Sequence, residues 1–155
     1  MTDMLLDRRH LVAGLAALAV ARPVGATPAR GITVHKDATC GCCSVWAKRM
    51  AETGRYTPRL VDQADMLAVK TRLRVPPELV SCHTTQVGAY VVEGHVPPMA
   101  VDRLLRERPA GVIGLAVPGM PAGSPGMEMP DGRREPYVVY AFGADGSSRV
   151  FARIG

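Results

Sequence analysis

The chain has 155 residues, 47% of them hydrophobic, and a formal net charge of +5. This length allows one domain of ordinary single-core size. The basic residues are interleaved with acidic ones, no block of Lys or Arg occurs, and few aromatic side chains could stack bases, so we expect no nucleic-acid partner.

Residues 1–26 have the order of a secretory signal peptide. Arg8 and Arg9 precede an apolar run from Leu11 to Val20, and Val24-Gly25-Ala26 offers small residues at the positions that signal peptidase reads. The run is roughly half of the ~20 residues that a membrane-spanning helix needs, so we expect no stable membrane anchor in the mature protein. The paired arginines keep both Sec and Tat export open. Either route predicts a periplasmic protein.

The next segments alternate between strand and helix patterns. We expect a linker at 27–31 and then one domain, residues 32–155. The predicted elements are a strand at 32–35, a helix from Thr39 to Gly54, a strand at 56–61, a helix at 64–73, a strand at 88–92, a hairpin turn at 93–95 and a helix from Pro98. This order predicts an α/β chain with the thioredoxin-like arrangement β-α-β-α-β-β-α.

Residues 117–155 differ in character and form a predicted C-terminal extension. Val117 to Gly132 is rich in Pro and Gly and shows no periodicity. Alternating apolar residues at 137–142 and 150–154 flank a turn at 143–146, which predicts a β-hairpin.

Three cysteines open the first predicted helix as Cys40-Gly41-Cys42-Cys43. The free N–H groups and the macrodipole of a helix N-terminus favour thiolate over thiol. In a thioredoxin-like arrangement the loop before the third strand lies beside this terminus, so we expect Cys82 to face the other three cysteines. His83, next to Cys82, is a candidate auxiliary ligand or orienting group.

Such a thiol cluster has several chemical uses. Cys40 and Cys43 have the spacing of a thiol-disulfide oxidoreductase, but Cys42 and Cys82 would give a mixed disulfide two further routes of escape. Structural disulfides from Cys40 or Cys43 to Cys82 would add little stability, and structural zinc lacks its paired knuckles. Cu(I) prefers thiolate and thioether ligands, and adjacent thiolates can bridge several ions. We therefore favour copper binding and keep the oxidoreductase as the alternative.

The methionines and the remaining histidines after residue 26 fall into two groups. Three methionines of the Pro- and Gly-rich segment are candidate copper donors: Met120, Met127 and Met129. Five side chains are expected to have other roles, the methionines in helix packing, His35 in a strand and His95 in the hairpin turn: Met50, Met66, Met99, His35 and His95.

Four motifs resemble the CopG-type family of secreted metal-binding proteins associated with bacterial copper resistance. They are Thr39-Cys40-Gly41-Cys42-Cys43 with Trp46, Ser81-Cys82-His83-Thr84, Glu93-Gly94-His95-Val96-Pro97, and the stretch from Gly119 to Glu128. The resemblance runs from about Ile32 to the C-terminus. It implies a thioredoxin-like fold with an appended extension, a periplasmic location, and copper held by Cys40, Cys42, Cys43 and Cys82.

The resemblance also implies that several copper ions can share the thiolates and that the protein can change the oxidation state of copper. His35 stands where this family more usually has an aromatic residue, which argues against His35 as a ligand. We therefore expect a periplasmic protein of copper resistance or homeostasis that buffers Cu(I) or passes it to another copper carrier or an efflux component. Whether it turns over as an enzyme stays open.

Overall fold

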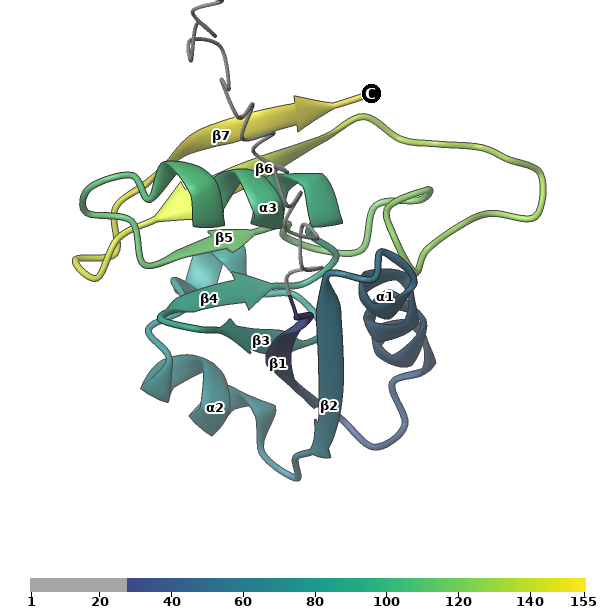
Figure 1. Cartoon of the computed structure of the whole chain (residues 1–155), viewed down its shortest axis with the longest axis horizontal. Helices are drawn as coiled ribbons and strands as arrows, with labels where there is room; N and C mark the ends of the chain where they lie inside the picture. Colours follow the sequence, from purple (N-terminus) through teal and green to yellow (C-terminus); the bar gives the residue numbers. More distant parts are fainter. Residues whose placement is uncertain (1–27) are drawn as a thin grey trace, which may run out of the picture.

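A seven-stranded mixed sheet runs through the computed structural model, which describes residues 28–155 (Figure 1). The strands are β1 (Arg30–Lys36), β2 (Tyr56–Asp62), β3 (Thr84–Val87), β4 (Tyr90–Glu93), β5 (Gly114–Ala116), β6 (Tyr137–Phe142) and β7 (Ser148–Ile154). Their order across the sheet is β2-β1-β3-β4-β5-β6-β7. The predicted signal peptide, residues 1–26, lies outside the described residues.

The helices are α1 (Gly41–Glu52), α2 (Met66–Arg72) and α3 (Pro98–Glu107), with a short 3₁₀ turn η1 (Pro77–Leu79) after α2. From β1 to α3 the elements follow the expected order β-α-β-α-β-β-α, and the α/β class is confirmed. The parallel pair β1 and β2 is connected by α1, as a crossover connection requires. No helix within residues 28–155 is long and apolar enough to cross a membrane.

Alternate residues of the strands face two different apolar clusters. Val92 contacts the larger cluster, which takes Trp46 and Met50 from α1 and Leu104 from α3. The neighbouring Val91 belongs to the smaller cluster on the opposite face. Trp46 is fully buried, and its indole N–H donates to the carbonyl oxygen of Val96 at 2.9 Å. α1 is therefore held firmly against the sheet at the end that carries the cysteines.

The beginning of α1 differs from the helix start that was predicted at Thr39. Cys40 is the N-cap residue and makes no side-chain capping bond. The hydroxyl and the N–H of Thr39 donate instead to the carboxylate of Asp37. This local turn satisfies Asp37 and Thr39 and leaves the start of the helix without a side-chain cap.

The β3-β4 hairpin also differs from the prediction. The third strand was expected at 88–92 and a turn at 93–95, but β3 already begins at Thr84 and the turn lies at Gly88, where φ is +61°. Thr84 and Thr85 are both fully buried although they are polar. The prediction was wrong because a buried strand with polar side chains has no apolar alternation to reveal it.

Beyond β4 the sheet continues with β5, which precedes the extension, and with β6 and β7 of the extension itself. The hairpin of β6 and β7 is confirmed, whereas β5, parallel to β4, was not predicted because three residues are too few for a pattern. Between β5 and β6 the Pro- and Gly-rich segment returns to the start of α1. A Cβ at Gly126 would lie 2.9 Å from the Cys42 carbonyl oxygen. The segment therefore packs directly on the first turn of α1.

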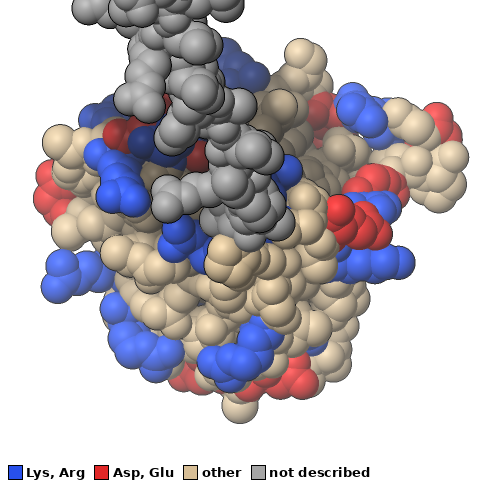
Figure 2. Space-filling view, viewed as in Figure 1, with Lys and Arg blue, Asp and Glu red and all other residues tan. Residues whose placement is uncertain are grey.

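On the face shown in Figure 2, Lys and Arg side chains are interspersed with Asp and Glu, and uncharged surface separates them.

Of the methionines expected to pack on helical faces, Met50 is fully buried, Met66 is half-buried and Met99 is 68% exposed. The prediction for Met99 was wrong because the first turn of α3 directs it to solvent.

Candidate metal centre

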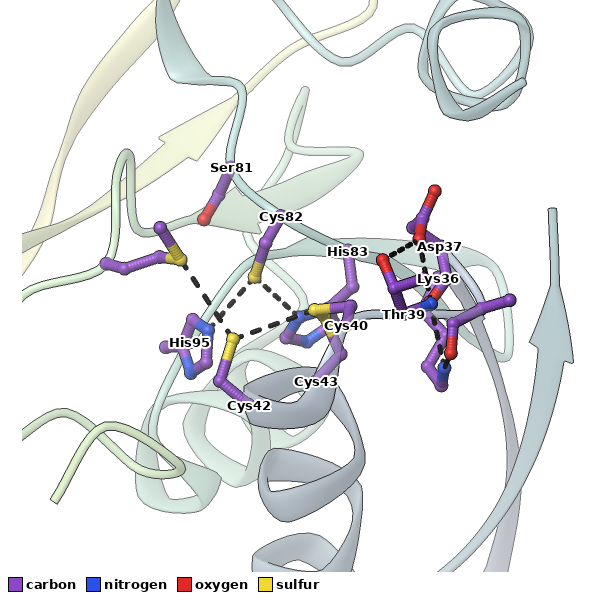
Figure 3. The surroundings of a disulfide bond; sticks show 12 residues. Lys36, Asp37, Thr39, Cys40, Cys42, Cys43, Ser81, Cys82, His83 and His95 are labelled. Atoms are coloured by element: carbon purple, nitrogen blue, oxygen red, sulfur yellow. Dashed lines mark hydrogen bonds between the residues drawn. A yellow bond between two sulfur atoms is a disulfide. The ribbon is translucent and has the colours of Figure 1, made fainter. Parts of the chain in front are cut away.

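Three of the four cysteines lie at the start of α1, Cys40 as its N-cap residue and Cys42 and Cys43 in its first turn (Figure 3). Cys40 and Cys43 are joined by a disulfide. Residues three apart lie on the same side of a helix, which brings these two sulfurs together. The Cys42 Sγ lies 3.6 Å from the Cys40 Sγ. Cys43 is fully buried, whereas Cys40 and Cys42 are partly exposed.

Cys82 reaches the same place from the loop between η1 and β3. The sulfur atoms of all four cysteines lie within 4.8 Å of one another. Cys42 and Cys82 are free thiols. The structure thus brings together the four cysteines that the sequence analysis selected, and two of them carry their sulfurs as thiols beside a disulfide.

A second donor group shares Cys82 with the first. The Cys82 Sγ lies 3.0 Å from Nε2 of His95 and 3.3 Å from Nδ1 of His83, and both imidazoles are fully buried. The prediction of His95 as a hairpin-turn residue was wrong, because the chain after β4 folds back toward the thiols and not into a turn. The Glu93-Gly94-His95-Val96-Pro97 motif was the signal in the sequence that could have identified it.

The protonation of His95 follows from its other contact. Its Nδ1 lies 2.8 Å from the carbonyl oxygen of Pro125. A carbonyl oxygen only accepts, so Nδ1 carries the hydrogen and the lone pair of the neutral ring is on Nε2, facing Cys82. Burial lowers the pKa of His95 and opposes the smaller effects of Pro125 and Glu128. His95 is therefore a neutral imidazole with its donor atom aimed at the thiol group.

Burial also determines the protonation of Cys82 and His83. It raises the pKa of Cys82 to about 12, and the neighbouring Cys42 adds to the shift. Burial, with smaller contributions from His95 and Lys70, lowers the pKa of His83 far below its ordinary value. Without a metal Cys82 is therefore a thiol, and a bound cation would have to displace its proton.

His83 has one nitrogen without a partner. Its Nδ1 faces Cys82, but its buried Nε2 has no hydrogen-bond partner among residues 28–155. The ring packs against Trp46, with ring centroids 4.6 Å apart, and meets His95 edge-on. These aromatic contacts hold the imidazole beside Cys82 while leaving its hydrogen-bonding capacity incomplete.

The Pro- and Gly-rich segment covers part of the site. The Met120 Sδ lies 4.0 Å from the Cys42 Sγ, and Met120 is 51% exposed. Met127 and Met129 are half-buried and make no polar contact with a cysteine in the described chain. Glu128 holds the segment to α1 by an ion pair with Arg49 at 2.8 Å. Met120 is thus the methionine of the segment that the structure brings to the thiols.

His35 and one sizeable cavity do not contribute to the thiol cluster. Both ring nitrogens of His35 are engaged, Nδ1 with Gln63 at 3.1 Å and Nε2 with Gln86 at 3.0 Å, as expected for a side chain that is not a ligand. A cavity of about 630 Å³ is lined by several prolines, Tyr137 and charged side chains, and by none of the four cysteines. The thiol cluster is instead open at the surface.

Comparison with solved structures identifies the family. Two structures described as "Copper resistance protein copG", forms 1 and 2, are each 44% identical to this chain. The matches cover 83% and 82% of this chain and 98% and 99% of theirs, with TM-scores of 0.75 and 0.76. The chain belongs to the CopG family. The resemblance noted in the sequence is thereby confirmed.

A family model described as "Protein of unknown function, DUF411" also matches, over residues 79–127. That span contains Cys82, His83, His95 and Met120, but not the cysteines of α1. No curated protein matches the chain. Membership of the CopG family, together with the cluster of four cysteines, supports a copper-related function for this chain.

Proposed function

We propose that this protein is an exported, thioredoxin-like copper-binding protein of copper resistance or homeostasis. Cys40, Cys42, Cys43 and Cys82 are its primary ligands in the reduced state. The observation that carries the proposal is the position of four cysteine sulfurs within 4.8 Å of one another in a chain 44% identical to a copper resistance protein.

The donor set favours Cu(I). Thiolates and a thioether are soft ligands, and the two buried imidazoles are neutral and therefore able to donate a lone pair. Cys82 belongs to both donor groups, the four cysteines and the set Cys82, His83 and His95. Because a thiolate can bridge two metal ions, this sharing supports the binding of more than one copper. His83 and His95 then act as auxiliary ligands or orient the thiolates.

The Cys40–Cys43 disulfide links copper binding to oxidation state. Reduction of this bond takes up two electrons and two protons and adds two thiol groups to the site. In the reverse direction, oxidation of the dithiol releases two electrons, enough to reduce two Cu(II) to two Cu(I) while the two protons leave to solvent. This balance supports a role in changing the oxidation state of copper.

Export and transfer complete the proposal. The signal-peptide pattern of residues 1–26 directs the protein to the periplasm. There Met120, half-exposed beside Cys42, gives a route by which copper enters or leaves, toward another copper carrier or an efflux component. Met127 and Met129 supply further donors if the segment moves.

The disulfide also favours one alternative function, a thiol-disulfide oxidoreductase. Cys40 is partly exposed and Cys43 is fully buried. Such an exchange catalyst needs one accessible sulfur to be attacked and a second, less accessible sulfur to resolve the mixed disulfide. Copper binding and disulfide exchange must therefore be measured on the same protein.

The test uses the mature protein, reduced and kept anaerobic. Cu(I) is titrated against a competing chelator for the wild type and for Cys42→Ser, and reduction of insulin disulfides is measured in parallel. We expect at least one Cu(I) per chain and an affinity about tenfold or more lower in the variant, because a direct ligand is lost. Binding below one equivalent, or unchanged binding in Cys42→Ser with persistent insulin reduction, would contradict copper binding by this cluster.

A further inference from the structure

A buried ion pair lies directly behind the metal centre. The Lys70 Nζ, on α2, is 2.6 Å from Glu93 Oε1 at the end of β4, and the two residues are 5% and 0% exposed. Thr84 joins them: its hydroxyl accepts a bond from Lys70 at 3.0 Å and donates one to Glu93 Oε2 at 2.6 Å. Both carboxylate oxygens of Glu93 are therefore engaged inside the protein.

Glu93 also holds the cysteine loop. Its Oε1 accepts the backbone N–H of Ser81, the residue before Cys82, at 2.7 Å. On the next residue, the N–H of Gly94 donates to the carbonyl oxygen of His83 at 2.9 Å. A Cβ at Gly94 would lie within 2.5 Å of the Ser81 side chain, so only glycine permits this close approach. Two hydrogen bonds thus attach the loop to the end of β4.

The ion pair lies at the point from which three donors leave the sheet. Thr84 and Glu93 face each other as the first rung of the β3-β4 ladder. Cys82 and His83 come immediately before that rung on one strand, and His95 follows it on the other. A shift at this rung would therefore move all three donors of the Cys82 group together.

Stability alone does not explain the choice of residues. Two buried charges lose their hydration, and well-packed hydrophobic residues of similar volume commonly serve stability equally well or better. What hydrophobic residues cannot do is direct a backbone N–H and a hydroxyl to fixed positions. We propose that Glu93, with its charge balanced by Lys70, is a positioning residue that fixes the Ser81-Cys82-His83 loop so that Cys82 faces Cys42 and His95.

This inference rests on the proposed function only where Cu(I) affinity is measured. Its first test uses no metal. In the disulfide form Cys42 and Cys82 are the free thiols of the described chain. Their rates of alkylation are measured by peptide mass spectrometry in the wild type and in Lys70→Met/Glu93→Leu, which replaces the ion pair by apolar residues. We expect the Cys82 rate to rise about tenfold relative to that of Cys42, while the melting temperature stays equal or rises.

Two further single variants are measured in the same way. Glu93→Gln keeps the shape of the side chain and is expected to raise the ratio of the Cys82 to the Cys42 alkylation rate by severalfold. It keeps the test decisive if the double variant does not fold. Asp102→Asn is the matched control, because Asp102 ties Arg55 and Tyr56 to α3 away from the thiols. It is expected to lower the melting temperature and leave the ratio unchanged.

The second readout is Cu(I) affinity of the reduced protein, expected to fall 10- to 100-fold in the double variant, as is typical when groups that orient ligands are removed. An unchanged alkylation ratio in both Glu93 variants, or a ratio that also rises in Asp102→Asn, would overturn the positioning role. Failure of the wild type itself to bind Cu(I) would overturn the proposed function and leave the alkylation result standing.

Discussion

Cys82 is the residue on which both donor groups depend. Its pKa, raised to about 12 by burial and by Cys42, keeps it protonated at neutral pH. A copper ion that binds it must release that proton, so binding strengthens as pH rises, by about tenfold per pH unit for each proton displaced. We predict that Cys82→Ser releases one proton fewer per chain than the wild type when Cu(I) binds near pH 7.5.

Calorimetry in two buffers with different ionisation enthalpies measures this number. The Cys42→Ser variant, titrated under the same conditions, shows whether the change belongs to Cys82 or to the loss of any thiol. Equal proton release by the wild type and Cys82→Ser would mean that Cys82 does not bind copper as a thiolate.

The residues of the site were predictable to different degrees. The four cysteines were found because three adjoin at a helix start and topology brings the fourth to it. His95 was missed because a histidine after a glycine is typical of a turn, and its hydrogen-bond partner Pro125 lies 30 residues later in the chain. Of the three candidate methionines, Met120 alone has a sulfur contact with a cysteine in the described chain, and segments without periodicity hold no signal that would separate it from the others.

Among the elements, the segment around Gly126 controls access to the thiols. Gly126 has φ of +89°, and a Cβ there would lie 2.8 Å from the backbone nitrogen of Trp46. We predict that Gly126→Ala lifts the segment from α1, costs about 1–3 kcal/mol of unfolding free energy, and speeds removal of Cu(I) by a chelator because Met120 is displaced.

Gly132→Ala is the matched control. Gly132 has a similar φ of +73°, but nothing lies within 4 Å of its Cβ position. Stopped-flow removal rates and denaturant unfolding of both variants separate backbone strain from the clash. Equal removal rates in the two variants would show that the segment does not cover the copper site.

Helix α2 contributes through its buried cation. We predict that Lys70→Met alone costs about 3–5 kcal/mol, because Glu93 is left as an unpaired buried charge. Burial already raises the pKa of Glu93, opposed by Lys70 and by its hydrogen bonds. Without Lys70 that pKa rises further, so the folded variant favours protonated Glu93 and loses stability as pH rises above about 4.5, the ordinary value.

Denaturant unfolding of the wild type and Lys70→Met from pH 4 to pH 8 measures this dependence. The difference in unfolding free energy should be small at the acidic end and largest at the alkaline end. A difference that is independent of pH would contradict the assignment of Glu93 as the group that titrates.

The helices and the final hairpin were predicted from periodicity and from turn residues, whereas β3 and β5 were not. The reason is physical in both cases. β3 buries two threonines, of which Thr84 is held by Lys70 and Glu93, and β5 is a three-residue strand whose pairing depends on β4 and β6. Tertiary contacts determine such strands, and local sequence does not reveal them.

At the scale of the whole molecule, export and oxidation determine which form of the site exists. We predict that the protein recovered from the periplasm begins at Thr27, after cleavage at Ala26. Intact-mass spectrometry of the periplasmic fraction reads both this cleavage and the two-hydrogen mass difference of the Cys40–Cys43 disulfide. Full-length protein retained in the cytoplasm would contradict export.

The central claim is that copper binds to the cysteine cluster in the reduced protein. X-ray absorption at the copper K-edge, on anaerobically reduced and loaded protein, tests it most directly. We predict Cu(I) with a first shell dominated by sulfur at about 2.3 Å, the length of metal–thiolate bonds in zinc sites, and less copper retained by the disulfide form. A first shell of nitrogen and oxygen alone, or equal retention by both forms, would contradict the account.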